Sequence, residues 1–191
     1  MAELRLPFAE QLDAGTLHLQ RLRYEDAEEI FYAYASKPDA TRFVTWPTHN
    51  RLADTRTFLR YAVQAWNAGH DFYYSIRLAG TNRLAGSIGA VVRGNEAQVG
   101  YVISPALWGR GIATAACFAL SGLLKNMPQL ARIWTFVDAE NTASQRVLQK
   151  CGWTRSELKP AYFAFVNQGN RLKDCYEFTL ERSPGPDLTA G

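Results

Sequence analysis

The chain has 191 residues, of which 47% are hydrophobic and 20% are charged, and its formal net charge is +3. This size and composition predict one globular domain that buries a core without disulfides or metal ions, and they exclude a disordered chain. The slight charge, without any block of Lys or Arg, argues against nucleic acid as a partner.

The cysteines and the N-terminus point to the cytoplasm. Cys117, Cys151 and Cys175 are an odd, widely spaced set without a CxxC pair, so we expect reduced thiols and no metal site. The N-terminal sequence MAELRLPFAEQLDAG contains acids and does not have the apolar core of a signal peptide or membrane anchor. We therefore expect a cytoplasmic protein with no membrane partner.

The first half of the chain predicts a strand, two helices and a meander. Residues 16–22, TLHLQRL, alternate apolar and polar side chains as a half-buried strand does, and we expect this strand to open the fold. Helices are expected over 25–36 and 52–67, the second ending at Gly69. Residues 71–104 then predict three antiparallel strands, separated by the turn sequences AGTN and RGNE.

The second half alternates helix and strand. A strongly apolar helix is expected over 112–126, a buried strand over 131–138, a helix over 142–151, and two strands over 153–157 and 173–180. The unit from Val99 to Val137 predicts a right-handed parallel crossover. The whole pattern predicts an α/β fold: a single mixed, mostly antiparallel sheet of about six to seven strands, flanked by about four helices. We expect an N-terminal extension over 1–15, the domain over 16–182 and a flexible tail over 183–191.

Two glycines and a proline lie where a strand meets a helix, in the stretch PALWGRGIAT at residues 105–114. Glycines before a helix let an anion approach the backbone N–H groups of the first turn, so the stretch suggests a phosphate site. A Walker loop is excluded because Ile112 follows Gly111, and a Rossmann fingerprint because Thr114 stands where its third glycine belongs. A tight turn that needs Gly111 only for its conformation is the alternative.

Two motifs resemble a known family. GYVISPALWGRGIATAA, followed later by VDAENTASQRVLQKCGW, is similar to the signature pair of the GNAT superfamily of acyl-CoA-dependent N-acyltransferases, in its RimJ/RimL branch. The pyrophosphate motif of the family is Gln or Arg, any two residues, Gly, any residue, then Gly or Ala. Gly111 and Ala113 fill its last positions and Trp108 replaces its first. The resemblance extends from Thr16 to Leu180 and includes LHLQRLRYEDAEEIF and TRFVTWP.

The resemblance implies acetyl transfer from acetyl-CoA to a primary amine by direct attack in a ternary complex. It implies that backbone N–H groups in the glycine turn hold the pyrophosphate, that the end of the preceding strand pairs with the pantetheine arm, that Asn141 contacts that arm, and that Ser144 lies near the sulfur. A helix cap is the alternative role for Asn141, and a solvent-facing position is the alternative for Ser144. The expected cofactor-binding residues are Val102, Ile103, Ser104, Trp108, Gly109, Arg110, Gly111, Ile112, Ala113, Thr114, Asn141 and Ser144.

The sequence departs from the family at both acid–base positions. Many members carry a Glu where this chain has Gln98, and a Tyr where it has Leu148. We expect Glu96, two residues earlier on the same strand face, to act through a water, and Ser144 to donate a hydrogen bond to the sulfur. Glu96 and Ser144 are thus the expected catalytic residues.

The absence of an evident strong base favours a weakly basic acceptor. An α-amine with a pKa near 7.7 to 8.0 is roughly a tenth neutral at pH 7, whereas a Lys amine is neutral about once in two thousand molecules. We therefore expect the acceptor to be the N-terminal α-amine of a protein or peptide, and the enzyme to be a monomer or homodimer. A small-molecule amine acceptor and a non-catalytic CoA-binding module are the alternatives.

Several loop and aromatic residues have two interpretations. They line an acceptor groove, or they are solvated histidines and core aromatics of no special function. The residues in question are Trp46, His49, His70, Tyr73, Tyr74 and Tyr162. An acyl-cysteine mechanism is disfavoured, since no activated thiol is evident.

Overall fold

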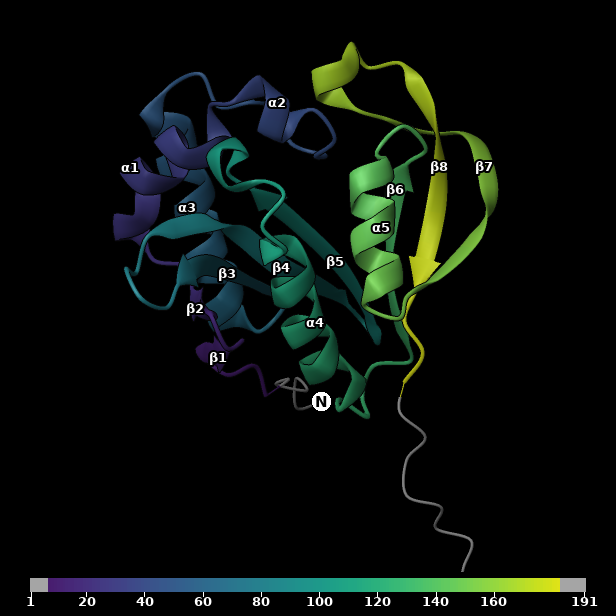
Figure 1. Cartoon of the computed structure of the whole chain (residues 1–191), viewed down its shortest axis with the longest axis horizontal. Coiled ribbons are helices and arrows are strands. Elements are labelled where there is room, and N and C mark those ends of the chain that lie inside the picture. Colours follow the sequence, from purple (N-terminus) through teal and green to yellow (C-terminus); the bar gives the residue numbers. More distant parts are fainter. Residues whose placement is uncertain (1–6, 183–191) are drawn as a thin grey trace, which may run out of the picture.

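The structure, a computed structural model, describes residues 7–182. These residues form one open eight-stranded sheet with helices on both faces (Figure 1). The strand order is β1-β2-β3-β4-β5-β6-β8-β7. The strands are β1 (Gln11–Asp13), β2 (Leu17–Arg21), β3 (Asp71–Leu78), β4 (Leu84–Arg93), β5 (Glu96–Ile103), β6 (Arg132–Asp138), β7 (Thr154–Ala164) and β8 (Leu172–Thr179). The α-helices are α1 (Ala27–Ile30), α2 (Pro38–Thr41), α3 (Leu52–Ala68), α4 (Ile112–Lys125) and α5 (Thr142–Lys150).

The predicted fold class is confirmed, but the sheet has more strands than predicted. The described residues contain eight strands rather than six or seven, because β1 pairs antiparallel with β2. This three-residue strand is too short to show an alternating pattern in the sequence, and it precedes the strand that was expected to open the fold. The predicted tail, 183–191, lies outside the described residues.

The helices also differ in detail from the prediction. The helix expected over 25–36 is divided into a 3₁₀ turn at Tyr24–Asp26, helix α1 and a π-helical turn at Phe31–Ala35. The short helix α2 begins with Pro38, whose fixed φ suits the first helical position, and lies in a segment without a long apolar pattern. Helix α3 ends as predicted, at Gly69 with φ of +82°.

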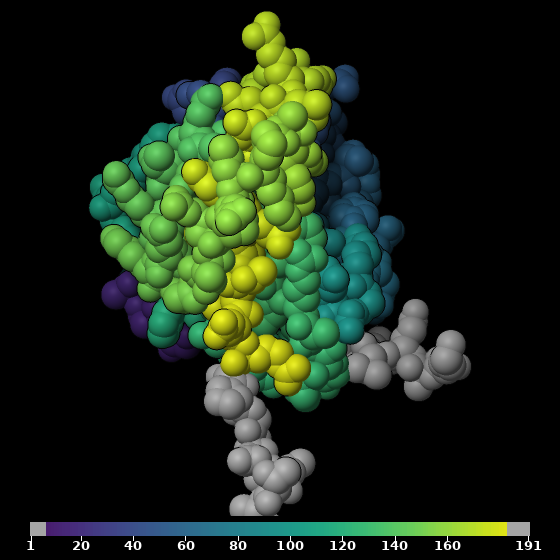
Figure 2. Space-filling view, turned by 90° about the vertical axis from the view of Figure 1, so that its right-hand side faces the viewer, coloured from purple at the N-terminus to yellow at the C-terminus, as the bar shows by residue number. Residues whose placement is uncertain are grey.

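The predicted parallel crossover is confirmed. Strands β5 and β6 pair in parallel and helix α4 connects them, whereas the other strand pairs in the described sheet are antiparallel. Helices α4 and α5 lie in front of the sheet in Figure 1, and α1 and α3 lie toward its other side. Figure 2 shows the molecule from the right-hand side of Figure 1, where β7 and β8 lie at the surface.

Two hydrophobic clusters hold these layers on the sheet. One contains Ala116, Leu120 and Leu124 of α4 packed with the sheet, and the other contains residues of α1 and α3 with Val102 of β5. Burying each large aliphatic side chain contributes about 1.5 to 3 kcal/mol. Strand β5 is therefore fixed from both faces, which makes it a rigid support for residues at its free edge. Within residues 7–182, no helix has the length and apolar character needed to cross a bilayer.

Candidate active site

The sheet opens between its two parallel strands. Strands β5 and β6 pair only through Glu96–Arg132, Ala97–Ile133 and Gln98–Trp134 in the described register. Beyond Gln98, β5 continues alongside β4 as far as Ile103, while β6 continues alongside β8 as far as Asp138. The strands diverge, and a cavity of about 810 Å³ extends through the gap.

The free edge of β5 presents backbone groups to this gap. The N–H of Ser104 donates to the carbonyl of Ala85 at 2.8 Å, so the backbone groups of Ser104 point toward β4. Backbone groups alternate in direction along a strand, and those of Val102 therefore point toward β4 as well. Those of Tyr101 and Ile103 point into the gap, where a ligand with amide groups can pair with them.

One of these groups already has a partner. The indole Nε1 of Trp108 donates to the Ile103 carbonyl at 2.9 Å. Of the expected stretch Val102 to Ser104, only Ile103 thus directs backbone groups toward the gap, and Tyr101, which also does so, was not among the expected residues. The signal that could have found it is the two-residue period of a strand with one paired edge.

The glycine turn forms an anion cradle at one end of the cavity. Gly109 and Gly111 have φ of +75° and +73°, a region that costs other residues about 1 to 2 kcal/mol. At the start of α4, the N–H of Ala115 donates to the Gly111 carbonyl at 3.0 Å. The N–H groups of residues 112–114 precede this bond, have no helical acceptor and belong to segments that line the cavity. Donors and the helix dipole there favour a bound phosphate.

Positive side chains surround the same end. Arg110 from the turn and Arg146 and Lys150 from α5 line the cavity. None of the three forms an ion pair with another residue in the range 7–182. Arg146 and Lys150 were not predicted, although their four-residue spacing places them on one face of α5. The donor set fits the phosphates of coenzyme A.

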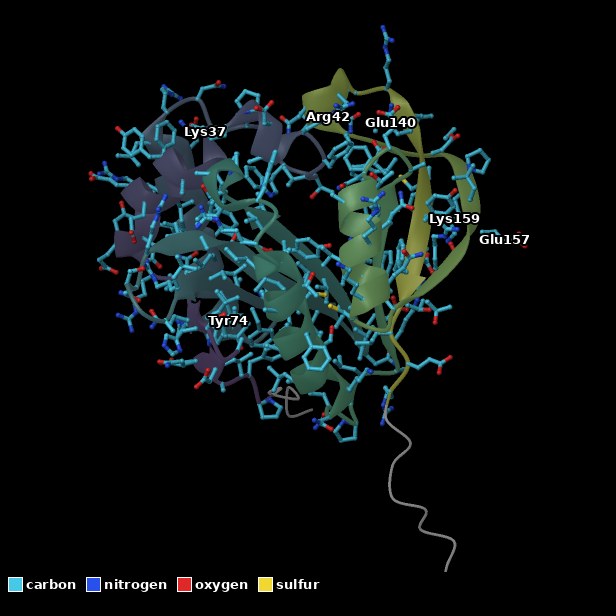
Figure 3. All side chains as sticks on the ribbon, viewed as in Figure 1. Lys37, Arg42, Tyr74, Glu140, Glu157 and Lys159 are labelled. Carbon is cyan, nitrogen blue, oxygen red and sulfur yellow. The ribbon has the colours of Figure 1, made fainter. Side chains whose placement is uncertain are left out.

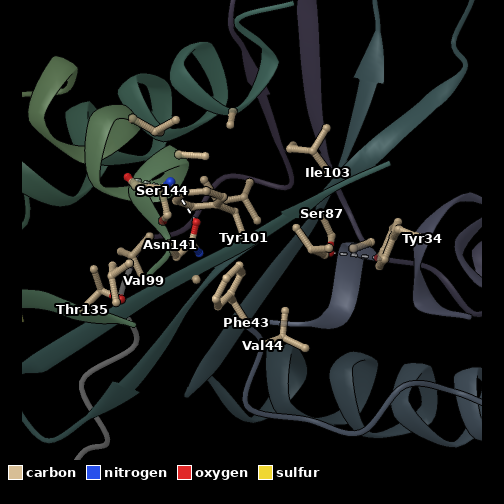
Figure 4. A pocket seen from close by; sticks show the side chains of 18 of the residues that line it. Tyr34, Phe43, Val44, Ser87, Val99, Tyr101, Ile103, Thr135, Asn141 and Ser144 are labelled. Carbon is tan, nitrogen blue, oxygen red and sulfur yellow. Dashed lines mark hydrogen bonds between the residues drawn. The ribbon is translucent and has the colours of Figure 1, made fainter. Parts of the chain in front are cut away.

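Asn141 and Ser144 lie on the cavity wall where α5 begins (Figure 4). The Asn141 Oδ1 accepts the Ser144 N–H at 3.1 Å, so Asn141 caps the helix, as the alternative interpretation held, and also lines the cavity. The Ser144 hydroxyl lies 2.7 Å from the hydroxyl of Tyr101 on β5. Burial raises the pKa of the Tyr101 phenol, with the Ser144 hydrogen bond acting against it. Tyr101 therefore stays protonated near neutral pH.

Glu96 lies at the closed end of the gap. It is the first residue of β5, and its carboxylate accepts from Arg132 Nη1 at 3.2 Å. It is absent from the residues that line the cavity, whereas Gln98 lines it. The structure does not bring Glu96 together with Ser144, because β5 carries it to the other side of the point where the strands separate.

The other end of the cavity is aromatic. Its lining side chains come from the segment after α2, from α3, and from strands on both sides of the gap: Phe43, Trp46, His49, Phe58, Tyr73, Phe136 and Phe165. Trp46, His49 and Tyr73 thus line the cavity, which favours the groove interpretation of these three residues. Tyr74 is a core residue whose hydroxyl donates to the Ala9 carbonyl at 2.8 Å, and Figure 3 shows it low in the fold. His70 and Tyr162 do not line this cavity.

A clasp joins the two halves of the molecule beside the aromatic end. The side-chain amide of Asn167 donates from Nδ2 to the carbonyls of Thr41 and Trp46 at 2.6 and 2.8 Å. Its Oδ1 accepts the Thr48 N–H at 2.9 Å. Arg42 also pairs with Glu140 at 3.1 Å, and the two lie together in Figure 3. The segment after α2 is therefore fixed to the loop before β8.

The three cysteines are buried free thiols. Interaction with Cys151, together with burial, raises the pKa of Cys117, which keeps this thiol protonated. A protonated thiol is a poor nucleophile, so Cys117 gives no support to an acyl-cysteine route. Within residues 7–182, no group of three His, Cys, Asp or Glu side chains is arranged to hold a metal ion.

A sheet that opens between parallel strands, with a helix N-terminus at one end of the gap and an aromatic chamber at the other, defines the class of acyl-CoA-dependent N-acyltransferases. Residues 16–154 match the family model of the acetyltransferase (GNAT) domain. The chain belongs to this family and is an acetyl-CoA-dependent N-acetyltransferase.

The chain is similar to several known proteins. It is 26% identical over 174 residues to the uncharacterized N-acetyltransferase p20 of Bacillus licheniformis, covering 90% of this chain and 96% of p20. A GNAT acetyltransferase structure from Bacillus anthracis has a TM-score of 0.78 and 24% identity, covering 90% of this chain and 98% of that one. RimL, a ribosomal L7/L12 alpha-N-protein acetyltransferase solved with coenzyme A, has a TM-score of 0.80 and 16% identity, covering 91% and 98%.

Proposed function

We propose that this enzyme acetylates the α-amine at the N-terminus of a protein or peptide. The observation that carries the proposal is the single cavity that links the anion cradle at residues 112–114 with the aromatic chamber. An acyl donor held by its phosphates and an amine entering from the aromatic end can meet in one enclosure. This arrangement supports direct attack in a ternary complex.

Different groups of the chain would bind the phosphates, orient the cofactor arm and donate to the sulfur. Acetyl-CoA supplies the activated acetyl group, and the N–H groups of residues 112–114 with Arg110, Arg146 and Lys150 would hold its phosphates. The backbone N–H and carbonyl of Tyr101 and the N–H of Ile103, whose carbonyl already accepts from Trp108, would orient its amide-bearing arm. The paired hydroxyls of Ser144 and Tyr101 would donate to the departing sulfur. Hydrogen bonds to a charged acceptor contribute about 1.5 to 3 kcal/mol each.

The carboxylates that line the cavity support a weakly basic acceptor. Asp138 is buried, and its two oxygens already accept from the Glu140 N–H and the Gln168 amide at 2.8 and 2.9 Å. Asp39 is exposed at the rim. Neither is a free carboxylate inside the chamber, where a Lys amine would need a strong base. RimL, which has the same fold, acts on an α-amine by its name.

A small-molecule amine is the second candidate, and the Asn167 clasp favours it. By fixing the segment from Thr41 to Thr48, the clasp limits how far the acceptor end can widen. The aromatic lining argues against a polycation such as a polyamine, which needs several carboxylates for recognition.

Measuring thiol release from acetyl-CoA with a matched acceptor panel tests the proposal. The panel contains a peptide with a free N-terminus, the same peptide N-terminally blocked but with an internal Lys, a small aromatic amine and a polyamine. We expect the highest kcat/KM with the free N-terminus. A higher value with the small amine selects the second candidate. Tight coenzyme A binding without acceptor-dependent release selects a non-catalytic binding module.

A further inference from the structure

A row of three aligned residues, two of them glycines, crosses the sheet to the gap. The strand register aligns Tyr73 of β3 with Gly89 of β4, and Gly89 with Gly100 of β5. A Cβ added to Gly89 would lie 2.5 Å from Cδ1 of Tyr73, so the phenol ring covers this glycine. Paired residues point to the same face of a sheet, and Tyr73, Gly89 and Gly100 therefore form one floor of the cavity.

The last position in this row is open. Gly100 is exposed although it lies in a central strand, and no heavy atom lies within 4 Å of an ideal Cβ built there. Gly100 also immediately precedes Tyr101, whose backbone faces the gap between β5 and β6. A small group resting on Gly100 thus lies beside the place where the thioester would be held.

One wall of this chamber carries an imidazole in a fixed orientation. The Nδ1 of His49 is 2.8 Å from the hydroxyl of Thr55, which is fully buried in α3. Trp46 and Phe58 flank the ring, with centroid distances of 5.1 and 6.5 Å, and Phe58 makes an edge contact of 5.5 Å with Tyr73. The aromatic contacts connect His49 to the ring that covers Gly89.

The second ring nitrogen is free to act. Among residues 7–182, Nε2 of His49 has no hydrogen-bond partner, and His49 lines the cavity while half-buried. If Nδ1–H donates to the Thr55 oxygen, Nε2 carries the lone pair. The same hydrogen bond persists after Nε2 is protonated, so the ring does not need to turn during a proton transfer.

The surroundings keep this imidazole neutral. Burial lowers the pKa of His49, while the nearby Asp54 carboxylate on α3 acts in the opposite direction. The other titratable groups at this end of the cavity are Tyr73 on β3, Asp39 on α2 and Tyr34, and burial raises the pKa of both phenols. Tyr34 and Tyr73 therefore stay uncharged, and His49 combines a neutral form at pH 7 with a free lone pair.

We propose that Nε2 of His49 accepts, through water in the cavity that both residues line, the proton of the acceptor amine seated over Gly100. The amine nitrogen forms a bond to the acetyl carbonyl carbon and gives one proton to Nε2, while the carbon–sulfur bond breaks and its electron pair leaves with the sulfur. The proton then passes through solvent to the thiolate, which gives an amide and a free thiol. The inference rests on the acetyl transfer to an amine proposed above, and it explains why Gln98 suffices where a Glu base is usual.

Kinetics with matched variants test the role of His49. We expect His49→Gln to lower kcat by about 10²-fold or more, with the acetyl-CoA Kd unchanged, because a positioned general base contributes at least this much. The loss of kcat at acid pH, which reports protonation of His49, is expected to disappear in this variant. His70→Gln, outside the cavity, is the control and keeps the rate and pH profile of the unchanged enzyme. A His49→Gln enzyme with an unaltered rate and profile overturns the proposal.

The seat over Gly100 has its own test. Because the space there is open, Gly100→Val is compatible with the fold and fills the seat. We expect it to raise the acceptor KM by about tenfold or more, since one lost contact of about 1.4 kcal/mol changes an affinity tenfold. Coenzyme A binding is expected to stay unchanged. An unchanged KM places the amine elsewhere and overturns this part.

A spectroscopic readout does not depend on activity. ¹⁵N chemical shifts of the His49 ring at pH 7.5 are expected to show the Nδ1–H tautomer, and Thr55→Val is expected to mix the two tautomers. A pure Nε2–H tautomer in the unchanged protein overturns the proposal even if the enzyme is active. If the unchanged enzyme releases no thiol with any amine, the proposed function fails, and His49 as its base fails with it.

Discussion

The hydroxyl oxygens of Tyr101 and Ser144 lie 2.7 Å apart and connect β5 with α5 across the gap in the sheet. Tyr101 also lies 3.3 Å from the Ser144 carbonyl. Because burial raises the pKa of Tyr101, the phenol keeps its proton and strengthens Ser144 as a donor. We propose that these two hydroxyls take the role of the Tyr that many family members carry at the position of Leu148, a side chain that is fully buried here.

Ser144→Ala is expected to lower kcat by about 10- to 100-fold and to leave the acetyl-CoA Kd nearly unchanged. The variant removes a hydrogen bond to developing charge, worth about 1.5 to 3 kcal/mol, while the phosphate cradle stays intact. Tyr101→Phe is expected to act in the same direction but less strongly. Steady-state kinetics and calorimetry separate the two quantities, and an equal kcat in Ser144→Ala removes this residue from the mechanism.

Gly111→Ala is expected to weaken coenzyme A binding by more than tenfold and to destabilise the fold by about 1 to 2 kcal/mol. The stability loss arises because φ of Gly111 is +73°, a region that an L-residue adopts only with strain. The binding loss arises because relief of that strain moves the N–H groups of residues 112–114 away from the phosphate.

Gly152→Ala is the matched control for Gly111→Ala. Gly152 has φ of +80° at the end of α5, and it is not among the cavity-lining residues. We expect a similar loss of stability in urea unfolding but normal coenzyme A affinity by calorimetry. If both variants lose stability and neither loses affinity, the glycine turn has only a conformational role.

The sequence predicted most of this fold because its elements have long periodic patterns and clear ends. The helix over Leu52–Ala68 ends at Gly69, and the three strands of the meander are separated by strong turn sequences. Strand β1 could not be predicted, because three residues carry no period and its stability comes from pairing with β2. The residues expected to bind the cofactor lie in contiguous motifs and, apart from Ser104, line one cavity, while their contact with a cofactor stays a prediction.

Three residues of the aromatic end, Trp46, His49 and Tyr73, were named from the sequence, but their arrangement could not be predicted, because they meet only in three dimensions. Nothing in the sequence relates His49 to Gly100, or Asn167 to Thr41, which is 126 positions away. Glu96 was expected from the alternation along one strand, but alternation does not reveal where β5 and β6 separate. The separation point depends on how β6 pairs with β8, a long-range choice that no local pattern encodes.

Asn167→Ala is expected to raise the KM of the acceptor without changing the acetyl-CoA Kd. The variant removes the hydrogen bonds that hold the segment from Thr41 to Thr48, which carries Trp46. If that segment then adopts its ordered position about a tenth of the time, the apparent KM rises about tenfold. Steady-state kinetics over a range of acceptor sizes measures the effect, and Arg171→Ala, at an exposed position in the same loop, is the control. An unchanged KM shows that the clasp does not shape the chamber.

Asp71, the first residue of β3, is expected to stabilise the fold in a pH-dependent way. The carboxylate of Asp71 is buried, accepts from Arg93 at 2.5 Å and also accepts from the Tyr61 hydroxyl. Burial acts to raise the pKa of Asp71, but the hydrogen bonds from Arg93 and Tyr61 outweigh it, so the pKa lies below its usual value. A carboxyl whose pKa is depressed in the folded state binds fewer protons there than in the unfolded chain.

The stabilisation by Asp71 is therefore complete above the unfolded pKa of about 3.9 and is lost as the pH falls through the lower folded value. Asp71→Asn is expected to reduce the free energy of unfolding by about 1 to 3 kcal/mol at pH 7, because hydrogen bonds to a charged group are lost. Urea unfolding at pH 7, 5 and 3 measures this difference between the two proteins. We expect it to be equal at pH 7 and 5 and smaller at pH 3. A difference that stays constant down to pH 3 would mean that packing at Asp71, rather than its charge, stabilises the start of β3.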